Sequence, residues 1–159
     1  MTFQISGLSP APFLPLFELS DAVLARRGIV RTEATSRPGF PCRVTLDDAE
    51  PGETLLLLNH ESHSAPTPYR SAYAIYVREL ARDAAVYTGD IPPVMRGRPL
   101  ALRLFDARGM LAGADLVLDG NPRGAIERAL ERDAIAYIDV HNAAYGCFAA
   151  RVTRTERAG

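Results

Sequence analysis

The chain has 159 residues and a formal net charge of −1, with 47% hydrophobic and 23% charged residues. These values are typical of one globular domain, and the length suffices for a sizeable core without disulfides or metal ions. A nucleic-acid-binding protein needs a basic face to neutralise phosphates, so the balanced charge argues against nucleic acid as a partner. All 18 basic residues are arginine. Every cation is therefore a planar fork that can hold a carboxylate or a phosphate through two hydrogen bonds.

Nothing in the sequence indicates export or a membrane partner. The first residues, MTFQISGLSPAPF, lack the basic stretch and apolar run of a secretory signal, and the longest aliphatic run covers only residues 55–58. Cys42 and Cys147 lack the close spacing of a zinc knuckle, and two cysteines do not make a disulfide framework. We therefore expect a cytoplasmic protein with both thiols reduced.

The first half of the chain predicts two helical segments and several strands. A short helical turn or an irregular segment, interrupted by prolines, is expected at residues 9–19. A helix is expected at 20–27, with Ser20 as its N-cap and Gly28 at its left-handed end. Strands are expected at residues 29–34, 43–46, 54–59 and 73–78, and a polar loop at 61–68.

The second half predicts a hairpin, a helix and two further strands. Residues 100–105 and 110–118 form the hairpin, and Gly109 supplies the positive φ of its turn. A helix is expected at 121–133 with Asn121 as the cap and Pro122 at its first position, and strands at 135–140 and 148–153. The pattern predicts the α+β class, with a mostly antiparallel, curved β-sheet and two main helices in a single globular domain over residues 3–154.

All three histidines and both cysteines lie in three short segments, each close to an expected strand end. These segments are RPGFPCR with Cys42, NHESH with His60 and His63, and HNAAYGC with His141 and Cys147. Since strand ends can converge on a folded sheet, the three segments can contribute to one polar site.

The last of these segments carries the candidate catalytic residues. Period two places Asp139 and His141 on one face of a strand, roughly 6.5–7 Å apart. Asp139 can then raise the proton affinity of His141, which becomes a candidate general base. Cys147 is a candidate nucleophile activated by His141. The alternatives are a solvent-facing polar edge for the pair and an inert buried thiol for Cys147, and Cys42 carries the same two interpretations.

The candidate ligand-binding residues are Arg43, Arg70, Tyr73 and Asn142. Guanidinium groups close to imidazoles and a tyrosine hydroxyl suit a small carboxylate or phosphate, although ordinary surface ion pairs are the alternative. Three histidines would also suit a zinc ion with an open fourth position, but a lone His-x-x-His pair in an expected loop is a weak signal, and we assign no metal ligand.

Several long segments together resemble a known family. They are RPGFPCRVTLDDAEPGE, LLLLNHE, TPYRSAYAIYVRE, IPPVMRGRPLALRLFD and YIDVHNAAYGCFAARV, and the similarity runs from about residue 3 to 154. In these segments the chain resembles domain of unknown function family 1203, a family of uncharacterised bacterial single-domain proteins. The resemblance implies no activity and no catalytic residue. It also implies that relatives often have histidine where this chain has Asp139 and tyrosine where it has His60, which weakens a metal site that depends on His60.

The sequence thus favours a small cytoplasmic enzyme or binding protein for a small anionic metabolite. Its site would be built from arginines and the histidine–cysteine segment near the C-terminus. One alternative is a non-catalytic interaction protein acting as a homodimer, and a second is a small metal-binding protein. The cofactor, the reaction and the ligand itself stay unknown at this level.

Overall fold

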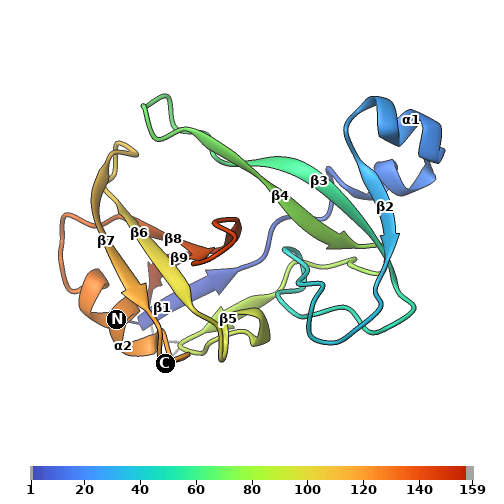
Figure 1. Ribbon diagram of the computed structural model, residues 1–159. Coiled ribbons are helices and arrows are strands. Elements are labelled where there is room, and N and C mark those ends of the chain that lie inside the picture. Colours follow the sequence, from blue (N-terminus) through green and yellow to red (C-terminus); the bar gives the residue numbers. More distant parts are fainter. Residues whose placement is uncertain (1, 157–159) are drawn as a thin grey trace.

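The computed structural model describes residues 2–156 and consists of two antiparallel β-sheets and two α-helices (Figure 1). The larger sheet has six strands in the order β5-β1-β9-β8-β6-β7, and the smaller has three in the order β2-β3-β4. The predicted α+β class with mostly antiparallel strands is therefore confirmed. Among residues 2–156, every helix is too short or too polar to cross a membrane.

The elements divide between the two sheets. The larger sheet contains β1 (Thr2–Ser6), β5 (Val86–Thr88), β6 (Leu100–Phe105), β7 (Leu111–Val117), β8 (Tyr137–Asn142) and β9 (Phe148–Thr155), with helix α2 (Arg123–Leu130) packed on one face. The smaller sheet contains β2 (Val30–Glu33), β3 (Thr54–His63) and β4 (Ser71–Arg78), with helix α1 (Asp21–Arg26) against β2. Two short 3-10 helices, η1 (Leu14–Glu18) and η2 (Pro93–Met95), lie in the connections.

Each sheet has its own apolar core. In the larger sheet, Ile126 of α2 packs among fully buried strand residues such as Ile138 and Val152. The core of the smaller sheet joins Leu24 of α1 to residues of β3 and β4. Burial of one such side chain contributes about 1.5–3 kcal/mol, so these cores hold the two sheets as stable platforms.

The β3–β4 ribbon connects the two sheets. One end of the ribbon belongs to the core of the smaller sheet, and the other end extends toward the β6–β7 hairpin (Figure 1). There the Thr67 hydroxyl donates to the Gly109 carbonyl over 3.0 Å, and the ring of His63 stacks on Phe105 with 4.1 Å between centroids. The ribbon therefore lies against the face of the larger sheet that α2 leaves uncovered.

Several local predictions are confirmed. Helix α1 begins after Ser20, whose hydroxyl accepts a hydrogen bond from Val23 N at 3.3 Å. The β6–β7 hairpin turns at residues 106–109, where Gly109 has φ +79°. Asp106 stabilises this turn because its Oδ1 accepts from the backbone of Arg108 and of Met110.

The prediction of a strand at residues 43–46 is wrong. These residues form a turn in which Leu46 N donates to the Cys42 carbonyl, and Leu46 has a φ of +54°. The alternation that suggested a strand has another origin. Val44 packs in the core of the smaller sheet, whereas Leu46 packs in the core of the larger one.

Other element boundaries also differ from the expectation. Strand β3 continues to His63 and so includes the first residues of the expected polar loop, because residues 59–61 and His63 pair with β4 around a bulge. Helix α2 is shorter than expected, with Pro122 as its N-cap residue in place of Asn121 and Leu130 as its last residue. The short strands β1 and β5 were not expected from the sequence at all.

Candidate functional site

The two faces of the six-stranded sheet differ sharply in polarity. Period-two alternation directs Ile5, Val152, Ile138 and Leu102 toward α2, and these side chains are fully buried. On the opposite face the strand register aligns Ser6, Arg151, Asp139 and Arg103 side by side on β1, β9, β8 and β6. We call these four residues the polar row. The row lies on the face that the β3–β4 ribbon approaches.

The Arg151–Asp139 ion pair lies at the centre of the polar row. Asp139 is only 1% exposed, and Arg151 donates to its two oxygens over 2.7 and 3.0 Å. The same guanidinium donates to the Ser62 carbonyl of β3 at 3.1 Å and lies 4.3 Å from the ring centroid of Tyr137. Burial opposes the charged form of Arg151, but the bond to Asp139 and its charge outweigh burial and raise the pKa of the guanidinium. Arg151 therefore stays charged and joins three strands.

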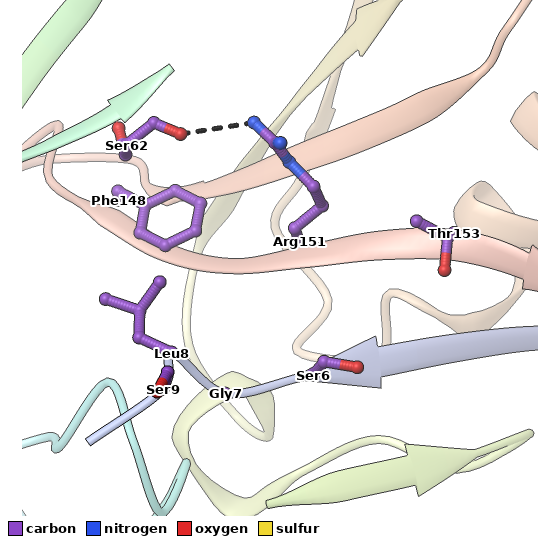
Figure 2. A pocket seen from close by; sticks show the side chains of 8 residues that line it. All are labelled: Ser6, Gly7, Leu8, Ser9, Ser62, Phe148, Arg151 and Thr153. Atoms are coloured by element: carbon purple, nitrogen blue, oxygen red, sulfur yellow. Dashed lines mark hydrogen bonds between the residues drawn. The ribbon is translucent and has the colours of Figure 1, made fainter. Parts of the chain in front are cut away.

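A cavity of about 290 Å³ opens beside this ion pair (Figure 2). Its walls come from the end of β1 and the segment after it, from β9, and from the end of β3. The lining residues are Ser6, Gly7, Leu8, Ser9, Ser62, Phe148, Arg151 and Thr153. The volume is near the lower end for ligand pockets, and the lining combines apolar surface with serine and threonine residues and one guanidinium, so it suits a small molecule that has both a polar group and an apolar part.

Arg103, at the other side of Asp139, has a different environment. It is the cross-strand neighbour of Asp139, but that carboxylate gives both oxygens to Arg151. Arg103 donates instead to the Tyr73 hydroxyl of β4 over 3.0 Å. The polar row thus contains two guanidinium groups and one carboxylate.

A second group of polar side chains surrounds Cys147, which directly precedes β9. Arg43 and Asn142 each donate to its sulfur over 3.2 Å. Arg43 is only 3% exposed, and it also donates to the backbone carbonyls of Phe148 at 2.8 Å and Pro41 at 2.5 Å. Burial lowers the pKa of Arg43, and the interaction with the nearby Cys147 opposes that effect.

His141 lies between this group and the polar row. Its Nδ1 is 2.8 Å from the Gly146 carbonyl, which can only accept, so Nδ1 carries the proton and Nε2 keeps its lone pair. The edge of its ring packs against Tyr73, with centroids 4.9 Å apart. Burial lowers the pKa of His141, and the positive charges of Arg103 and Arg43 lower it further. The Gly146 carbonyl and the charge of Asp139 act in the opposite direction but do not outweigh burial. His141 is therefore neutral at pH 7.

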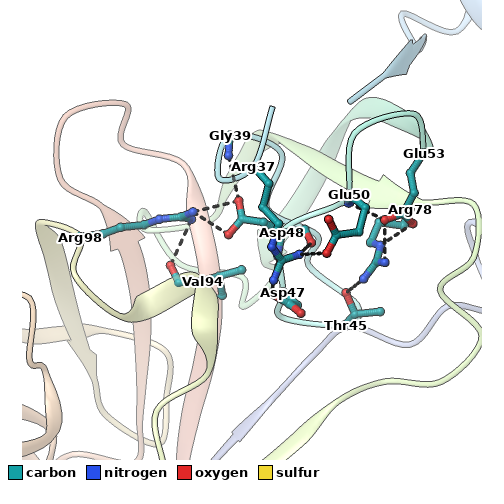
Figure 3. Close-up of polar contacts among 10 residues, drawn as sticks. All are labelled: Arg37, Gly39, Thr45, Asp47, Asp48, Glu50, Glu53, Arg78, Val94 and Arg98. Atoms are coloured by element: carbon teal, nitrogen blue, oxygen red, sulfur yellow. Dashed lines mark hydrogen bonds and ion pairs between the residues drawn. The ribbon is translucent and has the colours of Figure 1, made fainter. Parts of the chain in front are cut away.

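The loop that carries Arg43 is fixed by ion pairs (Figure 3). Arg98 donates to both carboxylate oxygens of Asp48, at 2.9 and 2.7 Å, and Gly39 N donates to the same side chain at 3.1 Å. Arg37 reaches Glu50 at 3.1 Å and the Asp48 carbonyl at 2.5 Å. Because Asp48 is buried, this network fixes the turn that inserts Arg43 between the two sheets.

The structure brings most of the sequence-predicted site residues together. Arg43, Asn142 and Cys147 are in direct contact, and His141 adjoins them through Gly146 and Tyr73. Asp139 lies on the same face as His141, as expected, but its hydrogen bonds go to Arg151.

The remaining candidates lie elsewhere. Arg70 is exposed, pairs with Glu61 and borders a separate shallow depression that includes Asn59. Cys42 is fully buried in the core of the smaller sheet, where its sulfur accepts from backbone N–H groups. His60 packs edge-on against Phe13 with centroids 5.8 Å apart.

His63, the third histidine, is buried beside the polar row. Its Nε2 lies 2.7 Å from the Tyr137 hydroxyl, and burial lowers the pKa of its imidazole. The three histidines therefore have different partners. Within residues 2–156, no group of three or more His, Cys, Asp or Glu side chains is placed to hold a metal ion.

Sequence reasoning missed Arg103 and Arg151. The sequence contained a signal for both residues. Arg103 lies between two of the alternating leucines of β6, and Arg151 lies between the apolar residues Ala150 and Val152 of β9. A charged residue on the face of a strand opposite its buried apolar residues indicates a polar face. The expected alternation on β8 did not reveal which strands would lie beside it.

Together, the fold and the site define an α+β protein with an arginine-rich sheet face that a β-ribbon covers in part. Residues 39–154 match the model of a family described as "Protein of unknown function (DUF1203)", and the chain belongs to this family. The resemblance noted from the sequence is thereby confirmed. No curated protein and no solved structure matches the chain. The matched range includes Arg43, Arg103, Cys147 and Arg151, but not β1, which supplies one wall of the cavity.

The buried carboxylate of Asp48 provides a test of the loop that carries Arg43. Asp48→Ala should lower the free energy of unfolding by about 2–3 kcal/mol, because Arg98 loses its partner in a mostly buried position. The measurement is urea unfolding followed by circular dichroism. In the matched control Asp90→Ala, both partners of the Asp90–Arg96 pair are more than half exposed, at 58% and 56%, and the loss should stay below about 1 kcal/mol. Equal losses in the two variants would contradict this account of the loop.

The lowered pKa of His141 gives a prediction for acid stability. Below about pH 6.5 the unfolded chain binds a proton at this imidazole more readily than the folded protein does. The free energy of unfolding therefore decreases as the pH is lowered from about 6.5 toward the pKa of the folded state. His141→Asn keeps a donor for the Gly146 carbonyl but cannot titrate. Urea unfolding at pH 7.5 and 5.5 should show a smaller loss in His141→Asn than in the unmodified protein. An identical loss would mean that His141 is not held neutral in the fold.

Proposed function

We propose that this protein binds a small anionic metabolite in the cavity between β1, β9 and the end of β3. Arg151 lines this cavity, and Arg103, which lies two strands away on the polar row, adds its positive charge to the attraction. The observation that carries the proposal is the charge of the polar row. Two guanidinium groups flank the single carboxylate of Asp139, so the row keeps one uncompensated positive charge. The neutral state of His141 leaves that charge unchanged.

The lining of the cavity supports an anion of limited size. Arg151 stays charged, and Ser6, Ser9 and Thr153 are among the residues that line the same space. Hydroxyls and guanidinium forks are the groups that hold carboxylates and phosphates in proteins. Phe148 and Leu8 supply the apolar part of the wall. A carboxylate or phosphate on a small carbon skeleton fits this combination.

The proposal includes a reducing compartment, the bacterial cytoplasm. Both cysteines are free, and Cys147 is partly exposed. Exposed thiols persist where glutathione or thioredoxin keeps them reduced. The family resemblance supports a bacterial source.

Arg103 offers a clean test, because its removal leaves no carboxylate without a partner. Phosphate, acetate, succinate and citrate would be titrated into the protein by calorimetry, with thermal denaturation as a second readout. At least one of these anions should bind and raise the melting temperature. Arg103→Gln should raise its Kd by about threefold or more, since a unit charge two strand spacings away contributes roughly 0.4–1.7 kcal/mol of attraction.

The matched control is Arg108→Gln, which removes the same charge from a side chain that is 82% exposed on the β6–β7 turn. Its Kd should equal that of the unmodified protein. Two results would contradict the proposal: none of the four anions binds, or the two substitutions weaken binding equally. The second result would show that both substitutions weaken anion binding only by lowering the net charge of the protein.

A further inference from the structure

Arg43 is a buried cation without a carboxylate partner in the described chain. It is 3% exposed, and its guanidinium donates to two backbone carbonyls and to the sulfur of Cys147. A buried charge is costly unless an opposite charge accompanies it, and carbonyl groups supply only dipoles. Of the three acceptors, only the sulfur can carry a full negative charge.

The surroundings of this sulfur favour the charged form. The guanidinium of Arg43 and the amide of Asn142 both donate to it, each over 3.2 Å. Two N–H donors directed at one sulfur stabilise a thiolate, since an S–H group accepts only weakly. Gly146 precedes Cys147 with a φ of +77° in a turn, and this turn keeps Cys147 partly exposed to solvent.

We propose that Cys147 is the thiolate counter-ion of Arg43 and a site of covalent modification by small electrophiles of the peroxide class. This inference is independent of anion binding at the polar row, because it depends on Arg43 and Asn142 and not on Arg103 or Arg151. It also leaves the charge of the polar row as described, since the thiolate neutralises Arg43 alone.

The reaction with hydrogen peroxide balances without a further cofactor. The thiolate sulfur attacks one peroxide oxygen, the S–O bond forms and the O–O bond breaks, and hydroxide leaves and takes a proton from the solvent. The sulfur loses two electrons and becomes a sulfenic acid, while the peroxide is reduced to water. Cys42 provides an internal comparison, because it is fully buried and its sulfur accepts only from backbone N–H groups.

The first test is the rate of alkylation by iodoacetamide at pH 6.5, with each cysteine followed by peptide mass spectrometry. Cys147 should react at least about tenfold faster than the thiol of glutathione under the same conditions, because the thiolate and not the thiol is the nucleophile. Cys42 should stay unmodified in the folded protein. A rate for Cys147 equal to or below that of glutathione would overturn the proposal.

The second test replaces one donor by an anion. Asn142→Asp puts a carboxylate beside the sulfur and offers Arg43 another partner, so alkylation of Cys147 at pH 6.5 should slow by about tenfold or more, because the added negative charge opposes the thiolate. The matched control Asn59→Asp makes the same change at an exposed position of β3 and should leave the rate unchanged. Equal rates in the two variants, with folding confirmed by circular dichroism, would contradict the thiolate–guanidinium pair.

Treatment with a small excess of hydrogen peroxide completes the test. Trapping with dimedone should label Cys147 and leave Cys42 unlabelled, and Asn142→Asp should reduce the labelling along with the alkylation rate. Absence of the label at Cys147, or equal labelling of both cysteines, would rule out Cys147 as a selective peroxide-reactive site.

Discussion

The Arg151–Asp139 ion pair is the interaction on which the proposed site depends. Asp139 is almost fully buried, and a carboxylate in that position requires a partner that satisfies both oxygens. The same guanidinium bonds to the Ser62 carbonyl, so one side chain connects β8 and β9 to the end of β3. The cavity lies beside this connection. If the pair were absent, the ribbon would lose its polar contact with the larger sheet at this point, and the cavity would lose one wall.

Arginine accounts for much of the polar architecture, because the chain contains no lysine. The fork of Arg78 holds Glu53 through two bonds of 2.8 and 2.7 Å, and Arg154 donates to backbone carbonyls at and after the end of α2, including Leu130 at 2.7 Å. Such pairs are satisfied within the fold. Arg103 and Arg43 differ, since one contacts a tyrosine hydroxyl and the other carbonyls and a sulfur. These two unbalanced cations underlie the anion site and the reactive thiolate that we propose.

Local patterns predicted what depends on local interactions, and failed where distant segments decide the conformation. The capped helix after Ser20 and the hairpin turn at Gly109 follow from caps and glycine conformation. The turn at residues 43–46 could not be predicted, because its apolar residues are divided between two cores that form only in the folded chain. Similarly, the segment 139–147 indicated a polar site, but its partner Arg151 depends on which strands lie side by side. Strand order is a long-range property that a single sequence does not encode in its local pattern.

The central claim is that the polar row carries an uncompensated positive charge that attracts small anions. The most direct test is a crystal soaked in bromide, with anomalous scattering used to locate the ions. The account predicts an anomalous peak on the polar row, within contact distance of Arg151 or Arg103 and continuous with the cavity. Peaks at exposed guanidinium groups such as Arg108, with none on the polar row, would contradict it.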